Sequence, residues 1–145
     1  MRVVVQRVTA ARVVVAGEVI AEIGRGLVLL VGLAPGDGEV EIAWMARKVA
    51  GLRVFADAAG LMNADLGEVG GEMLAVPNFT LLGDCRKGKR PSFTGALAPA
   101  LAAPLFARFV AALAAHVGPV ATGRFGASMR VELANDGPVT LVIET

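Results

Sequence analysis

The sequence is short of the residues that most hydrolytic and metal sites use. Its 145 residues include one cysteine, one histidine and no tyrosine. With a single histidine, neither a Ser/His/Asp triad nor a transition-metal site is easy to build, because imidazole is the usual base and ligand near neutral pH. A lone cysteine cannot form an internal disulfide, which suits a reducing compartment. We therefore expect a cytoplasmic protein that holds no metal.

Several motifs and segments are also missing. The sequence has no GxxxxGK[ST] loop, no GxGxxG after a strand and no GxSxG elbow, so several large enzyme classes drop out and we expect no cofactor. No uninterrupted apolar run approaches the ~18 residues of a spanning helix. Arg7 interrupts the first apolar run before a signal-peptide core could form. We expect neither a membrane segment nor an export signal.

Charge and composition favour a folded chain without a strong electrostatic partner. Fourteen lysines and arginines against 13 aspartates and glutamates give a formal net charge of +1, so any contact with RNA must come from a local cluster or from shape. Hydrophobic residues make up 55% of the chain and charged residues 19%, which excludes disorder. Because no linker or composition shift divides the chain, we predict one domain over residues 1–145.

The hydrophobic pattern predicts a β-rich α+β protein with two helices. Helical spacing of apolar residues predicts one helix over 38–51, which Gly51 ends, and another over 99–117, which Gly118 ends. Alternating or continuous apolar stretches predict strands at 3–6, 12–15, 19–23, 27–33, 54–55, 74–76, 120–124, 129–133 and 139–143. A turn over 135–138 is predicted to connect the last two strands.

Two segments combine features that suit a binding site. In Pro77-Asn78-Phe79-Thr80-Leu81, the hydroxyl of Thr80 lies between apolar neighbours and must be either satisfied or exposed in a cleft, although an ordinary strand-end threonine explains it as well. In Gly137-Pro138, a cis peptide bond would present two adjacent carbonyls, a compact acceptor for an ammonium group. An ordinary Asx turn is the alternative there.

A basic cluster follows the Thr80 segment. It places four cations in five residues without a carboxylate, which favours phosphate binding, although a solvated loop is equally compatible; its members are Arg86, Lys87, Lys89 and Arg90. Cys85 stands beside this cluster as a candidate thiol nucleophile, but no histidine accompanies it. Phe125 lies in a glycine-containing segment where it could stack on a base or belong to the core.

The order and spacing of these segments resemble the D-aminoacyl-tRNA deacylases, which hydrolyse D-amino acids mischarged on tRNA. The resemblance extends from end to end of the chain, and the segments that carry it include 1–8, 17–18, 24–27, 62–63, 70–71, 79–81, 90–93, 122–126 and 135–140. Gly137-Pro138 matches the cis Gly-Pro signature of the family. The other signature, Ser-Gln-x-Thr-Leu, is changed here, because Pro77 and Asn78 replace the serine and glutamine.

The resemblance implies a fold of two stacked, barrel-like sheets with two helices on one side. It also implies a homodimer in which Gly137 and Pro138 of one subunit reach into the partner's site beside Thr80. The two carbonyls would receive the α-ammonium of the substrate, leaving space for a D side chain or glycine and excluding an L side chain. The implied partner is the 3′ acceptor end of aminoacyl-tRNA, including glycine mischarged on the alanine tRNA.

The resemblance further implies a reaction without a side-chain nucleophile, assisted by the 2′-hydroxyl of the terminal adenosine. Phe79 and Thr80 are then the catalytic residues, through backbone N–H groups that polarise the carbonyl. Asn78, Gly137, Pro138 and Phe125 bind substrate, and the basic cluster contacts tRNA phosphates. A catalytically impaired tRNA-binding module and a Cys85 thiol hydrolase are the alternative hypotheses.

Overall fold

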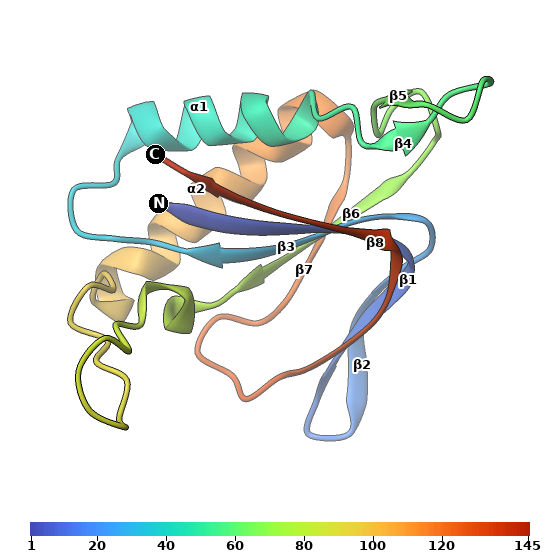
Figure 1. Cartoon of the computed structure of the whole chain (residues 1–145). Helices are drawn as coiled ribbons and strands as arrows, with labels where there is room; N and C mark the ends of the chain where they lie inside the picture. Colours follow the sequence, from blue (N-terminus) through green and yellow to red (C-terminus); the bar gives the residue numbers. More distant parts are fainter.

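Strands dominate residues 1–145, all of which the computed structural model describes (Figure 1). The elements are β1 (Arg2–Val15), β2 (Glu18–Ile23), β3 (Gly26–Gly32), α1 (Glu39–Ala50), β4 (Phe55–Ala56), β5 (Met62–Ala64), β6 (Glu72–Pro77), the 3₁₀ turn η1 (Phe79–Leu82), α2 (Pro99–Val117), β7 (Val120–Thr122) and β8 (Arg130–Glu144). The β-rich α+β class predicted from the sequence is confirmed.

Six strands form one nearly closed, barrel-like sheet in the order β2-β1-β3-β6-β7, with β8 also paired to β1. The β3–β6 and β6–β7 pairs are parallel, and the remaining pairs are antiparallel. Strands β3 and β6 occupy the middle and contribute residues to both hydrophobic clusters, which explains their nearly continuous apolar sequences. Strands β4 and β5 form a separate small sheet.

Both helices cover the same face of the large sheet, as expected (Figure 1). Helix α1 begins after Gly38, whose N–H donates to the Glu41 carboxylate at 2.9 Å, and it ends before Gly51. Helix α2 begins at Pro99, a residue suited to the first helical position, and ends before Gly118. The two predicted helices are therefore confirmed to within one residue at each end.

Helix α2 is long and apolar enough to meet the length and composition of a membrane span, which the search for uninterrupted apolar runs did not reveal. Arg108 interrupts the apolar residues of this helix, but the mean hydropathy remains high enough for a membrane span, at 1.7. One face of α2, with Phe106, Phe109 and Leu113, is buried in the main core, and 22% of the apolar window is buried.

The strand predictions were wrong in three places. The segments predicted as separate strands 3–6 and 12–15 are one strand, β1, because β8 pairs along both halves of it. The last two predicted strands are likewise one strand, and residues 135–138 form an irregularity within it rather than a turn between strands. Strand β5 was not predicted, since a three-residue strand carries almost no pattern.

Candidate active site

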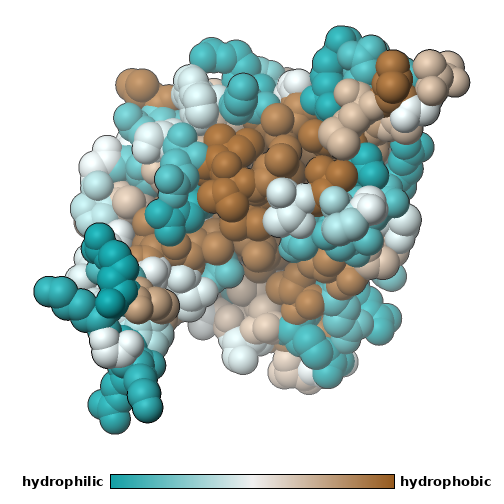
Figure 2. All heavy atoms as spheres, viewed as in Figure 1, coloured by the Kyte–Doolittle hydropathy of each residue, from teal (hydrophilic) through white to brown (hydrophobic).

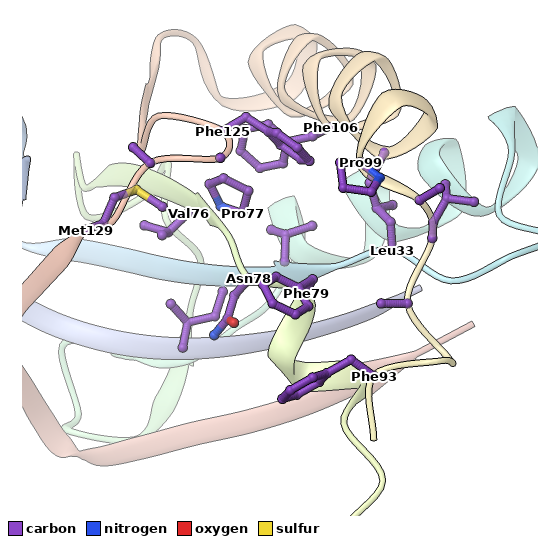
Figure 3. Close-up of a pocket in the computed structure, with 18 of the residues that line it drawn as sticks. Leu33, Val76, Pro77, Asn78, Phe79, Phe93, Pro99, Phe106, Phe125 and Met129 are labelled. Atoms are coloured by element: carbon purple, nitrogen blue, oxygen red, sulfur yellow. The ribbon is translucent and has the colours of Figure 1, made fainter. Parts of the chain in front are cut away.

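A cavity of about 600 Å³ opens at the carboxyl end of β6. Its walls come from the ends of β3 and β6, from η1, from the start of α2 and from the segment after β7, as Figure 3 shows for its labelled residues. Fifteen of its 19 lining residues are hydrophobic, among them Val76, Phe79, Phe93, Phe106, Phe125 and Met129. Clefts beyond the carboxyl ends of parallel strands are common ligand sites.

No lining residue of this cavity has an ionisable or hydroxyl side chain, and Asn78 provides its one polar side chain. Acid–base or nucleophilic catalysis by a lining side chain would need a carboxylate, imidazole, thiol, amine or hydroxyl group there. The chemistry available to a ligand in the cavity therefore comes from backbone groups, from the Asn78 amide and from the ligand itself.

The end of β6 explains why the cavity exists. The N–H of Gly123 donates to the Ala75 carbonyl at 2.9 Å, just beyond the last β6–β7 pair, Ala75 with Thr122. Pro77 has no N–H and cannot continue this ladder, so the chain after β7 separates from β6. On the other side, the Asn78 N–H donates to the Val31 carbonyl at 2.7 Å and keeps β6 attached to β3.

The turn η1 carries the residues predicted to be catalytic. Asn78 caps this turn, and its Oδ1 accepts hydrogen bonds from the Thr80 N–H at 3.2 Å and from Thr80 Oγ1 at 2.5 Å. The N–H of Phe79 donates to no group of the chain, and the Phe79 residue is 58% exposed at the cavity. Phe79 and Asn78 line the cavity, whereas Thr80 is exposed next to them and is bound to the lining residue Asn78.

Aromatic rings form two pairs around the cavity. Phe79 and Phe93 pack edge to face with ring centroids 5.2 Å apart, and Phe106 and Phe125 pack at a tilt with centroids 6.4 Å apart. Phe125 is 36% exposed, so it belongs to the cavity wall rather than to the closed core. Such walls suit a planar, largely apolar group.

Gly137 and Pro138 lie on β8 and are joined by a cis peptide bond, as predicted. The β1–β8 register advances from Val8–Asn135 to Gln6–Thr140, so residues 136–139 bulge opposite Arg7. Arg7 holds this bulge, because its guanidinium lies 3.0 Å from Asp136 Oδ2 and donates to the Val54 carbonyl at 2.5 Å.

Gly137 and Pro138 are both exposed, and neither lines the cavity of its own chain. The structure thus brings Asn78, Phe79 and Phe125 together around one cavity and places the Gly-Pro bulge elsewhere on the molecule.

The basic cluster lies on the exposed loop that follows η1, and this loop projects at the lower left in Figures 1 and 2. Arg86 pairs with Asp84 at 2.6 Å and holds the pKa of that carboxyl below its ordinary value. Lys87, Lys89 and Arg90 form no ion pair. Cys85 is exposed on the same loop and lines no part of the cavity.

Sequence reasoning missed four residues of this region. Phe93, Phe106 and Met129 line the cavity, and Arg7 holds the Gly-Pro bulge. Arg7 appeared only as a charge that interrupts an apolar stretch, and its partners lie 47 and 129 residues away. No local pattern carries that information.

The fold and the site define a class: a β-rich α+β protein whose apolar cavity presents backbone groups and one amide to its ligand. The family described as "D-Tyr-tRNA(Tyr) deacylase" matches residues 4–144, so the chain belongs to the D-aminoacyl-tRNA deacylase family. The activity of this family is hydrolytic deacylation of D-aminoacyl-tRNA.

Curated relatives agree with this assignment, and solved structures share the fold. The chain is 54% identical to a D-aminoacyl-tRNA deacylase of Desulfitobacterium hafniense (strain DSM 10664 / DCB-2), with 100% of this chain and 97% of the relative covered. It is 52% identical to one of Desulfatibacillum aliphaticivorans, with coverages of 100% and 99%.

Among solved structures, the "c-Myc DNA Unwinding Element Binding Protein" superposes with a TM-score of 0.94 at 38% identity, covering 100% of this chain and 99% of that one. A "probable eukaryotic D-amino acid tRNA deacylase" shares the fold, with a TM-score of 0.83 at 19% identity and coverages of 98% and 97%.

Proposed function

We propose that this chain hydrolyses the ester bond of D-aminoacyl-tRNA in the cytoplasm, releases the free D-amino acid and tRNA, and spares L-aminoacyl esters. Glycine mischarged on the alanine tRNA is a further substrate. The observation that carries this proposal is the cavity in which the Phe79 N–H is unpaired and no ionisable side chain is present. Such a site suits a substrate that supplies its own reactive hydroxyl.

In this mechanism, the 2′-hydroxyl of the terminal adenosine assists the attack of water on the ester carbonyl. The Phe79 N–H stabilises the oxyanion that develops, and the Thr80 N–H donates to Asn78 Oδ1 in the same turn. Collapse of the tetrahedral intermediate breaks the bond between the carbonyl carbon and the ribose oxygen. The ribose oxygen takes the proton that the attacking water loses, so no metal or cofactor is required.

The aromatic wall and the basic loop account for the rest of the substrate. Phe125, packed on Phe106, offers a partly exposed ring to the terminal adenine. The loop cations Arg86, Lys87, Lys89 and Arg90 contact acceptor-stem phosphates, which would make affinity depend on salt.

The active form is a homodimer in which each site is shared. The outer edge of β8 has no partner strand. Leu141 and Val142 are exposed on this strand. Figure 2 shows apolar surface across the face that β1 and β8 share. An unpaired apolar edge strand is a ready surface for a second copy. Gly137 and Pro138 lie on the same strand, outside their own cavity, and in the proposed dimer they reach the partner's cavity.

The Gly137 and Pro138 carbonyls would then receive the substrate's α-ammonium group, because an ammonium has only donors to offer. A D side chain or a hydrogen points away from the bulge, and an L side chain collides with it. Selectivity arises from this clash against the wrong stereoisomer.

Subunit complementation tests the shared site. Phe79→Pro removes the free N–H, and Asn78 before it is already extended (φ −145°, ψ 89°), as a residue before proline should be. Gly137→Ala disturbs the bulge, because φ is +118° there and a Cβ would lie 2.9 Å from Arg7 Nη2. When equal amounts of the two inactive variants are refolded together, about half of the dimers are mixed. If sites are shared, one of the two sites in each mixed dimer is intact, which is about a quarter of all sites. No recovery in mixed dimers would refute the shared site.

Glycyl-tRNA tests the source of selectivity. Glycine and L-alanine on the alanine tRNA differ by one methyl group, so we expect the glycyl ester to be hydrolysed and the L-alanyl ester to be spared. Equal kcat/KM for the two esters would refute selection by a clash at the α-carbon.

A further inference from the structure

The two hydrogen bonds between Asn78 and Thr80 fix the direction of each bond. A backbone N–H only donates, so the Asn78 atom 3.2 Å from the Thr80 nitrogen must be the carbonyl oxygen Oδ1. The Thr80 hydroxyl lies 2.5 Å from the same oxygen. Since that oxygen only accepts, the hydroxyl must donate its single proton to it.

This arrangement determines what Thr80 can offer to a substrate. Its hydroxyl proton and its N–H are both directed to Asn78, and the hydroxyl keeps only lone pairs for other partners. The Phe79 N–H is then the one amide of this segment that is free to donate into the cavity.

Asn78 is itself held on both sides. Its N–H donates to the Val31 carbonyl at 2.7 Å, and its carbonyl accepts from the Leu81 N–H at 3.4 Å. Figure 3 shows the Asn78 side chain next to Phe79 at the cavity. The side-chain oxygen of Asn78 accepts from the N–H of Thr80, two residues later. This contact is typical of Asx turns and requires a side chain as short as that of asparagine or aspartate. The glutamine of the family signature is one methylene longer than this contact requires.

We propose that Asn78 is a positioning residue that acts through Thr80: its Oδ1 orients the Thr80 hydroxyl as an acceptor toward the substrate and fixes the Phe79 N–H as the donor to the oxyanion. This proposal rests on the deacylase function proposed above. According to this proposal, Thr80 Oγ1 accepts a hydrogen bond from a donor group of the substrate, such as the ribose 2′-hydroxyl. The ester carbonyl accepts its hydrogen bond from the Phe79 N–H alone.

A double-mutant cycle with D-tyrosyl-tRNA tests the proposal, using kcat and KM measured separately. Asn78→Ala removes the acceptor and Thr80→Val removes the hydroxyl. We expect each to lower kcat about tenfold and to change KM by less than about twofold, because only orientation is lost. The double variant should lose no more than about twofold beyond the worse single variant. A product of the two single effects, about a hundredfold, would overturn the proposal.

Rescue separates the oxygen of Asn78 from its amide nitrogen. Asn78→Asp keeps an acceptor for both Thr80 groups and removes the N–H donors, but it adds a negative charge beside the oxyanion donor, so its kcat should lie between those of Asn78→Ala and wild type. If Asn78→Asp falls as far as Asn78→Ala, the amide N–H groups matter and the proposal is wrong.

Asn63→Ala is the matched control, because Asn63 is exposed on β5 and lines no part of the cavity. Its kcat should equal that of wild type. Thermal unfolding of every variant shows whether the loss of the cap has affected the fold, and we expect the Tm to fall by only a few degrees. A wild-type chain inactive on the D ester would refute the proposed function. An active wild type with an unchanged Asn78→Ala would refute the positioning role alone.

Discussion

Replacing Gly32 with alanine should slow deacylation by displacing the turn that carries the Phe79 N–H. Gly32 ends β3 directly beneath that turn. A Cβ at this position would lie 2.2 Å from Leu82 Cδ2, 3.1 Å from Leu81 Cβ and 3.2 Å from the Asn78 carbonyl oxygen. The Leu82 methyl group can rotate away, but the other two atoms move only with the main chain of the turn.

The size of the effect follows from these distances. Ordinary contacts begin near 3.4 Å, so the turn must retreat by a few tenths of an ångström. Misplacement by about 1 Å costs about a hundredfold in rate, and the smaller shift predicts a loss of about three- to tenfold in kcat. Overpacking at one site costs about 1–3 kcal/mol, which lowers the Tm by several degrees and leaves the chain folded.

The assay is single-turnover deacylation of D-tyrosyl-tRNA with saturating protein, together with thermal unfolding. Gly51→Ala is the matched control, because its Cβ would meet only the Arg47 carbonyl oxygen at an ordinary 3.5 Å. We expect the control to keep the wild-type rate constant. A folded Gly32→Ala protein with the wild-type rate constant would show that the position of this turn does not govern catalysis.

Three further predictions address the thiol, the basic loop and pH. Cys85→Ser should retain full activity, since Cys85 lines no part of the cavity, and loss of turnover would restore the thiol-hydrolase hypothesis. Lys87→Glu with Lys89→Glu should raise KM, leave kcat unchanged and reduce the slope of log KM against log salt by about 2; an unchanged slope would make the loop merely solvated. Because Arg86 lowers the pKa of Asp84 below its ordinary 3.8, that ion pair is complete above the ordinary value and is lost only as pH falls through the lowered one. KM should therefore show no step between about pH 5 and about pH 6.5, below the ordinary pKa of about 7.7 at which the substrate's α-ammonium loses its proton, and kcat should show no step near the imidazole pKa of about 6.5; either step would contradict the site described here.

The sequence indicated those features that local patterns determine. The ends of both helices could be predicted from Pro99, Gly51 and Gly118, because caps and helix breakers act within one turn. The Thr80 and Gly-Pro segments stood out by composition, and the cis bond was predicted correctly.

Features that depend on long-range pairing could not be predicted in this way. The continuity of β1 and β8 is a property of their mutual pairing, and each half looks like a separate strand alone. The bulge at Gly137 was interpreted as a turn for the same reason. Phe106 joins the cavity only because α2 packs across the end of β6. The direction of the Asn78–Thr80 hydrogen bonds depends on the conformation of the turn, which the sequence does not specify.

The most direct test of this account is deacylation of D-tyrosyl-tRNA and L-tyrosyl-tRNA by the purified chain, with a chelator present and at matched concentrations. We expect rapid loss of the D ester and no loss of the L ester beyond spontaneous hydrolysis, with the chelator having no effect. That result would also show that Pro77 and Asn78 are tolerated in the site. Equal turnover of both esters, or tight tRNA binding without loss of either, would contradict the account, and the latter would identify a tRNA-binding module.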